Sequence, residues 1–232
     1  MESRANRRSS GISHETIYRH VYADKAAGGS LWEQLRCQKK RKKRYASGRN
    51  RRGQIVGRRP ISERPEHIEA RSQIGHWEGD TVIGAHHKQA IVTLVERKSG
   101  YALIAKVSNK TSDLVSQAII TQLNPVTPLV KTLTFDNGKE FAEHQRIDNA
   151  LQSTTYFADP FASWQRGSNE NFNGLLRQYI PKKRPLSTVT NQELRMIQQE
   201  LNSRPRKRLG LLPHEAFMYG LKRVALYFLT YD

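Results

Sequence analysis

The stretch His76–Val107 reads HWEGDTVIGAHHKQAIVTLVERKSGYALIAKV and contains three apolar runs. HWEGDTVIG, QAIVTLVER and YALIAKV have the length and the Val, Ile and Leu content of β-strands. Turn-forming residues separate these runs around Ala85–Lys88 and at Ser99 and Gly100. Because both connections are short, we expect the three strands to form an antiparallel meander.

Helices and strands alternate after this meander. An amphipathic helix is predicted at Ser112–Leu123, and Asn124–Pro125 ends it. A strand at Leu129–Phe135, a helix near Glu140–Leu151 and a short strand at Thr154–Phe157 follow. This order predicts an α/β fold with a mixed five-stranded sheet flanked by helices. It matches the ribonuclease-H-like architecture, although a fold alone does not fix a function.

The composition is that of a folded protein with a very polar surface. Its 232 residues can form one substantial core and an appendage, and 37% of them are hydrophobic. No segment has the ~20 apolar residues of a membrane span, and Met1–Gly11 lacks the apolar run of a secretory signal. The single cysteine, Cys37, can form neither an internal disulfide nor a zinc site alone, which fits a reducing cytoplasm. We therefore expect a cytoplasmic protein without a membrane partner.

Basic residues are concentrated in the first third of the chain. Lys and Arg number 39 against 21 acids, a net charge of +18, and residues 1–75 hold 19 basic and 7 acidic residues. Lys39–Arg59 has 11 basic residues among 21 and no acid, which favours a polyanion partner. We favour nucleic acid over a membrane because no apolar face accompanies the run; a linker without a specific partner is the alternative. The candidate DNA contacts in this run are Lys39, Lys40, Arg41, Lys42, Lys43, Arg44, Arg51 and Arg52.

A short helical segment precedes the basic run. Ser13 can cap a helix that extends through Tyr22, with Ile17 and Val21 on one face. A second short helix is expected around Leu31–Arg36. The first helix has the form of the recognition helix of a helix-turn-helix, but the residues alone favour an ordinary amphipathic helix.

One aspartate lies inside a predicted strand, and another directly follows one. Asp80 lies inside the first strand, on the same face as Glu78, where a charged group must find a partner or shift its pKa. An exposed acid on a half-solvated face is the alternative. Asp136 follows the strand of KTLTFDNGKEF, at the end where open α/β sheets bind ligands. A simple Asx turn or helix cap, with Asn137 and Gly138 in the turn, is the alternative.

A third acid, Glu170, falls in the segment GSNENFNGLLRQYI, which predicts a helix from near Ser168. The apolar residues of this helix form one stripe at i, i+3, i+4 and i+7: Phe172, Leu175, Leu176 and Tyr179. The opposite, polar face carries Glu170, Asn173, Gly174 and Arg177. We expect the stripe to pack inward and Glu170 and Arg177 to be presented together, with Gly174 leaving room for a close approach. A plain solvent-facing Glu is the alternative.

Three converging carboxylates require a cation, because otherwise they raise one another's pKa. Hard oxygen ligands without Cys or dedicated His favour Mg²⁺ or Mn²⁺ over zinc. Two such ions, about 4 Å apart, can activate the attacking oxygen and stabilise the leaving oxygen in phosphodiester displacement. If Asp80, Asp136 and Glu170 converge, we therefore expect a site for Mg²⁺ or Mn²⁺, with two ions.

Several segments together resemble the DDE transposases of bacterial insertion sequences. The motif RGSNENFNGLLRQYIPK (Arg166–Lys182) is similar to the hallmark of the IS-thirty family, which has a retroviral-integrase-like catalytic core. GHWEGDTV, TFDNGKEF and the interval from Asp136 to Glu170 also agree with that family. ISHETIYRHVY and LNSRPRKRLGLLPHEAF extend the resemblance from about Gly11 to Phe217.

The resemblance implies a function and a set of site residues. Asp80, Asp136 and Glu170 would be the metal-binding catalytic triad. The implied chemistry is strand cleavage by water at the element ends, followed by attack of the freed 3′-hydroxyl on another phosphodiester. The implied partner is double-stranded DNA, both element ends and target, bound by a homo-oligomer in a bacterial, nucleoid-associated setting.

Three further DNA contacts are predicted near the triad. Helix phase places Arg177 where it should touch a DNA phosphate beside the metal site. Asn173 and Trp164 are candidates for DNA contact or substrate positioning, and core packing is the alternative for Trp164.

The resemblance also suggests a division of the chain. Residues 1–38 would be a remnant of a helix-turn-helix region, 39–73 a basic linker, 74–220 the integrase-like catalytic core and 221–232 an atypical C-terminal tail. Family members carry a longer N-terminal region, and Lys183–Leu186 departs from the family pattern, so we expect a truncated transposase. The alternatives are a DNA-binding fragment without turnover that competes with or regulates a full-length transposase, and a stand-alone nuclease of the same fold.

Overall fold

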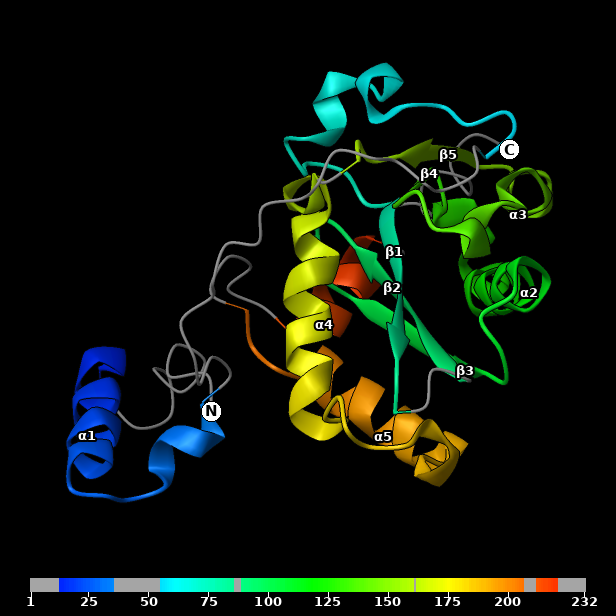
Figure 1. Ribbon diagram of the computed structural model, residues 1–232. Helices are drawn as coiled ribbons and strands as arrows, with labels where there is room; N and C mark the ends of the chain where they lie inside the picture. The colour runs from blue at the N-terminus through cyan, green and yellow to red at the C-terminus, as the bar shows by residue number, and fades with distance from the viewer. Residues whose placement is uncertain (1–12, 36–54, 86–88, 161, 207–211, 221–232) are drawn as a thin grey trace.

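A five-stranded mixed sheet forms the centre of the computed structural model, which describes residues 13–35, 55–85, 89–160, 162–206 and 212–220 (Figure 1). The strands are β1 (His76–Ile83), β2 (Ala90–Glu96), β3 (Ala102–Val107), β4 (Thr132–Phe135) and β5 (Thr154–Phe157). Their order is β3-β2-β1-β4-β5: the first three strands are antiparallel, and β4 and β5 run parallel to β1. The predicted meander and mixed sheet are confirmed.

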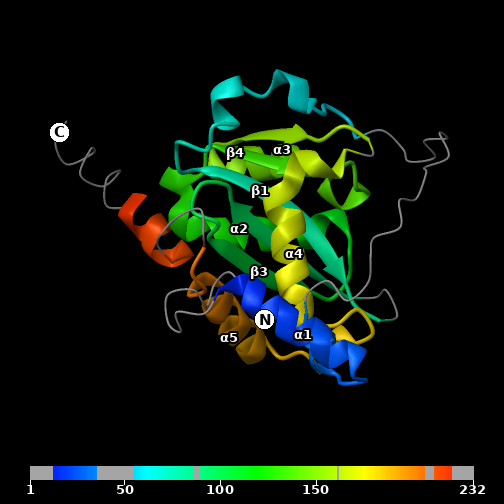
Figure 2. The same ribbon diagram turned by 90° about the vertical axis from the view of Figure 1, so that its left-hand side faces the viewer.

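Helices cover both faces of this sheet. The α-helices of the core are α2 (Ser112–Leu123), α3 (His144–Leu151), α4 (Gly167–Tyr179) and α5 (Asn191–Asn202). Figures 1 and 2 show α2 and α3 on one face and α4 and α5 on the other. The α/β architecture with a mixed five-stranded sheet flanked by helices, predicted from the sequence, is therefore present.

Each face of the sheet has its own apolar core. Trp77, Leu94 and Leu133 pack with α2 and α3. Val82 and Ile91 pack instead with α4 and α5. Because side chains alternate along a strand, the even-numbered residues of β1 point toward α4.

Short 3₁₀ helices connect these elements. They are η2 (Leu31–Gln34), η3 (Ile61–Glu63), η4 (Glu66–Ile68), η5 (Asn124–Leu129), η6 (Lys139–Phe141), η7 (Ser163–Arg166) and η8 (Leu186–Thr188). The strand predicted from Leu129 starts only at Thr132, because Pro125 and Pro128 hold η5 in a turn-like course. The helix predicted near Glu140–Leu151 is divided into η6 and α3.

Part of the segment assigned to the basic linker, residues 55–73, packs against the sheet. Ile55 belongs to the core, and Ile68 is 2% exposed. Pro60 forms a β-bridge with Phe157, and the buried guanidinium of Arg64 donates to Thr134 Oγ1 (3.0 Å). The folded part therefore extends N-terminal to residue 74, through single buried residues that leave no periodic pattern in the sequence.

A small helical unit lies at the N-terminal side of the chain. The helix α1 (His14–Ala26) is capped by Ser13, whose Oγ accepts a hydrogen bond from Thr16 N (3.2 Å), as predicted. The carboxylate of Asp24 accepts from Leu31 N (2.9 Å) and so joins α1 to η2. Residues 36–54, with every candidate contact from Lys39 to Arg52, and residues 221–232 lie outside the described residues. Among the residues described, no helix is long and apolar enough to cross a membrane.

Candidate active site

Asp80 lies in β1 and faces helix α4. Its Oδ1 accepts a hydrogen bond from Thr81 N (2.8 Å), and its Oδ2 accepts one from Nδ2 of Asn173 on α4 (2.9 Å). Burial raises the pKa of Asp80, Arg166 opposes this increase, and Asp136 adds to it. The side chain is 25% exposed, so Asp80 is neither a freely solvated acid nor sealed from ligands.

Asp136 directly follows β4, the neighbour of β1. Its Oδ1 accepts from Gly138 N (2.8 Å), so the Asx turn considered as the simpler alternative is present. The adjacent Asn137 donates to the carbonyl O of Ala158 (2.7 Å) and accepts from Arg58. These bonds fix the loop after β4 and leave Oδ2 of Asp136 directed at a different partner.

That partner is Arg166, at the junction of η7 and α4. One guanidinium nitrogen lies 3.5 Å from Oδ2 of Asp80 and the other lies 3.5 Å from Oδ2 of Asp136. The first nitrogen also donates to the carbonyl O of Gly79 (3.0 Å). The side chain of Arg166 is only 10% exposed. A single buried cation thus bridges the two aspartates predicted to act together.

A row of polar side chains at helical spacing seats the α4 segment on the sheet: Arg166, Asn169, Asn173 and Arg177. Asn169 is fully buried and donates from Nδ2 to the carbonyl oxygens of Glu78 (2.9 Å) and Thr93 (3.2 Å). Arg177 donates to the carbonyl O of Ile83 (2.7 Å). These contacts fix the rotation of α4 about its axis and hence the direction in which Glu170 projects.

Glu170 lies in the first turn of α4 and is half-buried. The predicted apolar stripe is confirmed, because Phe172, Leu175 and Leu176 are buried against the sheet. Arg177 differs from the prediction: its guanidinium donates to the carbonyl oxygens of Ile83 and Ile180, which anchors it to the protein. Among the described residues, no three His, Cys, Asp or Glu side chains lie close enough to hold a metal ion together.

Another carboxylate, that of Glu140, lies behind Asp80. Glu140 is 7% exposed, and its Oε1 accepts from Thr81 Oγ1 (3.0 Å) and pairs with Lys110 Nζ (2.6 Å). Glu140 also raises the pKa of Asp80 through its charge. Since Thr81 is next to Asp80 in β1, its hydrogen bond to Glu140 links β1 to η6, which follows Asp136.

The ring of Phe135 lies close to β1 and fixes the spacing between β1 and β4. The ring of Phe135, the last residue of β4, stacks on Phe141 with centroids 4.3 Å apart. A Cβ at Gly79 would overlap that ring of Phe135. Glycine is therefore required at the position between Glu78 and Asp80.

A buried charge cluster continues from Glu78, on the same face as Asp80. Glu78 is fully buried, lies 3.6 Å from the guanidinium of Arg97, and accepts a hydrogen bond from Asn169 N (2.9 Å). Arg97 also pairs with Glu69 (2.9 Å). The prediction that Glu78 and Asp80 share a face is confirmed, and Glu78 serves to hold α4 and the segment before β1.

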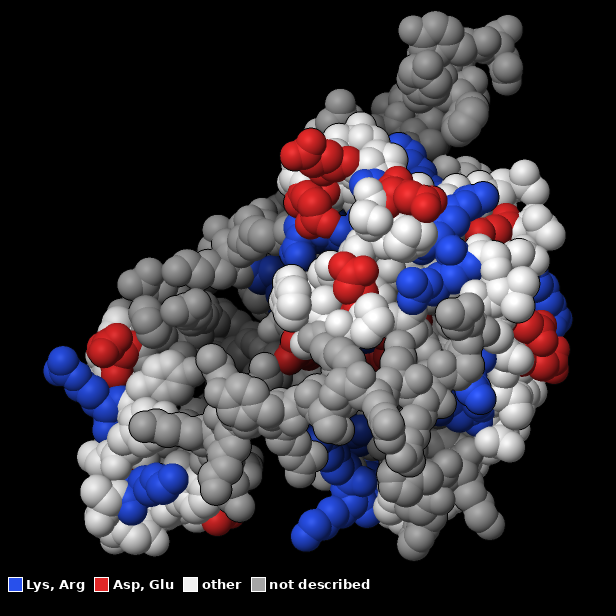
Figure 3. Space-filling model, turned by 45° about the horizontal axis from the view of Figure 1, so that its top comes forward, with Lys and Arg blue, Asp and Glu red and all other residues white. Residues whose placement is uncertain are grey.

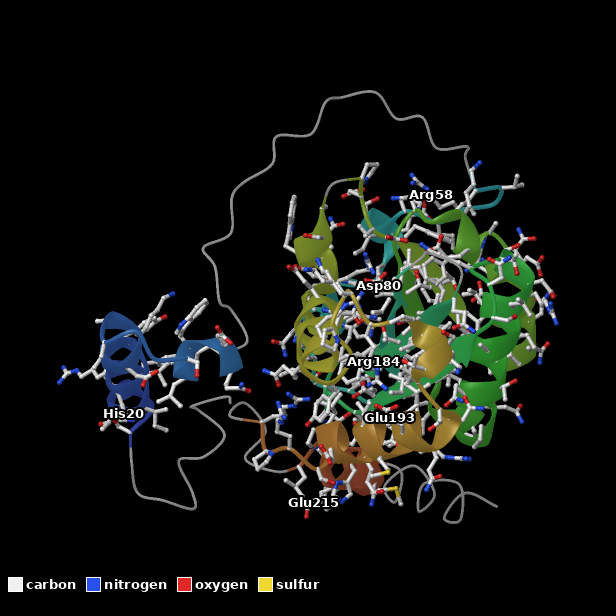
Figure 4. The ribbon with its side chains drawn as sticks, turned by 60° about the horizontal axis from the view of Figure 1, so that its bottom comes forward. His20, Arg58, Asp80, Arg184, Glu193 and Glu215 are labelled. Carbon is white, nitrogen blue, oxygen red and sulfur yellow. The ribbon has the colours of Figure 1, made fainter. Side chains whose placement is uncertain are left out.

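The surface of the protein shows an exposed Trp164 and a mixed distribution of charges. Trp164 in η7 is 74% exposed, which excludes the core-packing alternative for its indole. Figure 4 labels Asp80 beside α4 and Arg58 in the same part of the core. Figure 3 shows Asp and Glu interspersed with Lys and Arg over the face it presents, without a continuous basic patch on the atoms that are described.

Sequence reasoning missed Arg166, Asn169 and Glu140. A signal for the first two existed, because Arg166, Asn169, Asn173 and Arg177 recur every three or four residues, as a buried helix face does. Glu140 gave no local signal, because its partners Thr81 and Lys110 are distant in the sequence.

The position of the two aspartates fits a site for a divalent cation. Asp80 and Asp136 come from adjacent strands, and a positive charge already lies between them. Their oxygens are the hard ligands that Mg²⁺ and Mn²⁺ prefer. Glu170 lies on α4, the helix that is tied to Asp80 by the hydrogen bond of Asn173.

Known proteins resemble this chain over most of its length. It is 47% identical over 207 residues to a transposase for insertion sequence element IS4351 of Bacteroides fragilis, which covers 89% of the chain. It is 40% identical over 204 residues to transposase InsI for element IS30A of Escherichia coli K12, which covers 85% of the chain. The chain is thus similar to insertion-sequence transposases, among them that of element IS30A.

The match to these transposases is partial in length. The chain spans 64% of the Bacteroides transposase and 53% of the Escherichia coli transposase. No protein-family model matches the chain. The catalytic core domain of BIV integrase superposes with a TM-score of 0.49 at 22% identity, over 64% of this chain and 96% of that domain.

Proposed function

We propose that this chain is the catalytic part of a transposase that cleaves DNA strands and joins them to new sites in the presence of Mg²⁺ or Mn²⁺. One observation carries the proposal: Asp80 and Asp136, from adjacent strands, converge on one cation beside the helix that carries Glu170. The similarity to insertion-sequence transposases supports the same proposal.

Asp80, Asp136 and Glu170 would hold the metal, with two ions as the proposed number. Bound there, divalent ions would supply activation of the attacking oxygen and stabilisation of the leaving oxygen. The protein supplies orientation: Thr81 N and Asn173 fix the Asp80 carboxylate, and Gly138 N fixes that of Asp136. Since both aspartates are held by hydrogen bonds before any ligand arrives, little reorganisation is needed on binding.

The proposed substrate is double-stranded DNA, both the ends of the element and the target. The basic residues from Lys39 to Arg52 and the exposed indole of Trp164 are the proposed contacts. Asn173 and Arg177 complete the proposed set, and the guanidinium of Arg177 also donates to the carbonyl oxygens of Ile83 and Ile180. We also propose a homo-oligomer as the active form, since two element ends must be held together.

A nicking and joining assay on duplex DNA that carries the ends of the gene's own element tests the proposal. The unaltered chain should cut this DNA with Mg²⁺ or Mn²⁺, and Asp80→Asn and Glu170→Gln should abolish cutting. Glu215→Gln is the matched control, because Glu215 is exposed and accepts a hydrogen bond from Leu212 N (3.1 Å) near the C-terminal side.

DNA binding measured on the same variants separates the two functional readings. Affinity should fall steeply with salt, by about 0.9 log units per log unit of salt for each phosphate neutralised, and should survive Asp80→Asn. Salt-sensitive binding by an unaltered chain that never cuts would reject the enzyme and leave the DNA-binding fragment.

A further inference from the structure

The Arg166 side chain occupies the place where the two aspartates meet. Its guanidinium lies 3.5 Å from one carboxylate oxygen of Asp80 and 3.5 Å from one of Asp136. Charge-assisted hydrogen bonds between such groups are usually about 2.7–2.9 Å long. The two contacts with the aspartates are therefore ion pairs and not short hydrogen bonds. The hydrogen bond that anchors Arg166 is the one to Gly79 O (3.0 Å).

We propose that Arg166 is an internal counter-ion of Asp80 and Asp136, and that a divalent cation binds these carboxylates by displacing its guanidinium. The inference rests on the metal site proposed above. It concerns a residue that the triad does not include.

Charge and space both favour displacement. A divalent ion takes carboxylate oxygens at about 2.0–2.2 Å and brings two positive charges. The guanidinium faces the same Oδ2 atoms, so both cations cannot hold those oxygens at close range, and they repel each other. The nitrogen that faces Asp80 also donates to Gly79 O, so release of the carboxylates requires this hydrogen bond to bend or break.

Displacement makes the metal and the arginine competitors. Because its guanidinium lies 3.5 Å from both carboxylates, Arg166 offsets the repulsion between Asp80 and Asp136 when it is paired. The same pairing must be broken before metal binds, so it weakens the observed metal affinity. A released guanidinium is then free to meet a phosphate, which would couple metal loading to DNA binding.

Mn²⁺ binding measured by titration calorimetry without DNA tests this competition. Arg166→Gln should bind Mn²⁺ at least roughly tenfold more tightly than the unaltered chain, because one opposing cation has been removed. Arg184→Gln is the matched control and should leave the affinity unchanged, because Arg184 pairs with Glu193 away from the aspartates (2.7 Å). Equal or weaker Mn²⁺ binding by Arg166→Gln would overturn the proposal.

A second measurement uses the unaltered chain and so does not depend on the folding of a variant. In NMR spectra, the Nε–H signal of Arg166 should shift in proportion to Mg²⁺ occupancy. A signal that stays in place while Mg²⁺ binds, or the absence of any binding, would also overturn the proposal. Displacement without DNA cleavage would instead leave this inference standing and reject the proposed function.

Discussion

Asn173 on α4 donates from Nδ2 to Oδ2 of Asp80 (2.9 Å), while its Oδ1 accepts from Thr93 Oγ1 on β2 (2.9 Å). The side-chain amide of Asn173 therefore has a fixed orientation. It holds the Asp80 carboxylate in place where β1, β2 and α4 meet. Asn173→Ala should lower the rate of metal-dependent DNA cutting about tenfold, a loss of about 1.4 kcal/mol of transition-state stabilisation, through a less ordered Asp80.

The control for this variant is Asn149→Ala, an exposed asparagine of α3 on the other face of the sheet. Cutting rates and melting temperatures should be measured for both. If Asn173→Ala melts like the unaltered chain and cuts at the same rate, the positioning role of Asn173 is wrong.

Gly79→Ala should destabilise the fold, because the new methyl group would overlap the ring of Phe135. Overpacking of this kind costs typically about 1–3 kcal/mol. The displaced Phe135 would also move Asp136, the next residue, so cutting should fall with stability. Chemical denaturation measures the effect, and Gly167→Ala, whose Cβ would meet no atom within 4 Å, should not lower stability. Equal stabilities of the two variants would show that the strand spacing tolerates a methyl group.

The pair of buried Glu140 and partly exposed Lys110 should show strong energetic coupling. Lys110→Met leaves a 7% exposed carboxylate without its cation and should cost about 2 kcal/mol. Adding Glu140→Gln should recover at least about 1 kcal/mol in a double-mutant cycle. The exposed pair Arg146–Asp113 is the comparison, with an expected coupling below about 0.5 kcal/mol. Similar couplings for the two pairs would contradict the role given to Glu140.

His76 should make the fold less stable in mild acid. Burial, followed by the charge of Lys131, lowers the pKa of His76 from 6.5 to about 4. Between these values the unfolded chain binds a proton that the folded chain does not, so stability falls as pH falls from 6.5 toward 4. At pH 5 this loss should amount to about 2 kcal/mol.

Urea denaturation at pH 7 and pH 5 measures this effect. His76→Asn should lose less stability between the two pH values than the unaltered chain does. His20→Asn, at an exposed position of α1, should behave like the unaltered chain. The same pH response in all three proteins would contradict the assignment to His76.

The fold was largely predictable because its signals are local. Apolar runs such as QAIVTLVER define strands by themselves, and Asp80 and Asp136 could be placed because each belongs to such a run. The helix of Glu170 was predictable from its apolar stripe, which is buried as expected.

The contacts that organise the site were not predictable, because they join residues far apart in the chain. Helix phase placed Asn173 and Arg177 on a polar face, but it could not show that this face meets β1 rather than solvent. Arg64 and Ile68 were assigned to a linker because isolated buried residues leave no periodicity, although Arg64 contacts Thr134 and Ile68 is buried.

The most direct test of the central claim is an anomalous-scattering map from crystals of the chain grown with Mn²⁺. We predict a manganese peak bound by Asp80 and Asp136, with a carboxylate oxygen of Glu170 within about 2.2 Å of an ion and the guanidinium of Arg166 withdrawn from the two aspartates. A peak completed by Glu140 in place of Glu170, or no peak between the aspartates, would contradict the account.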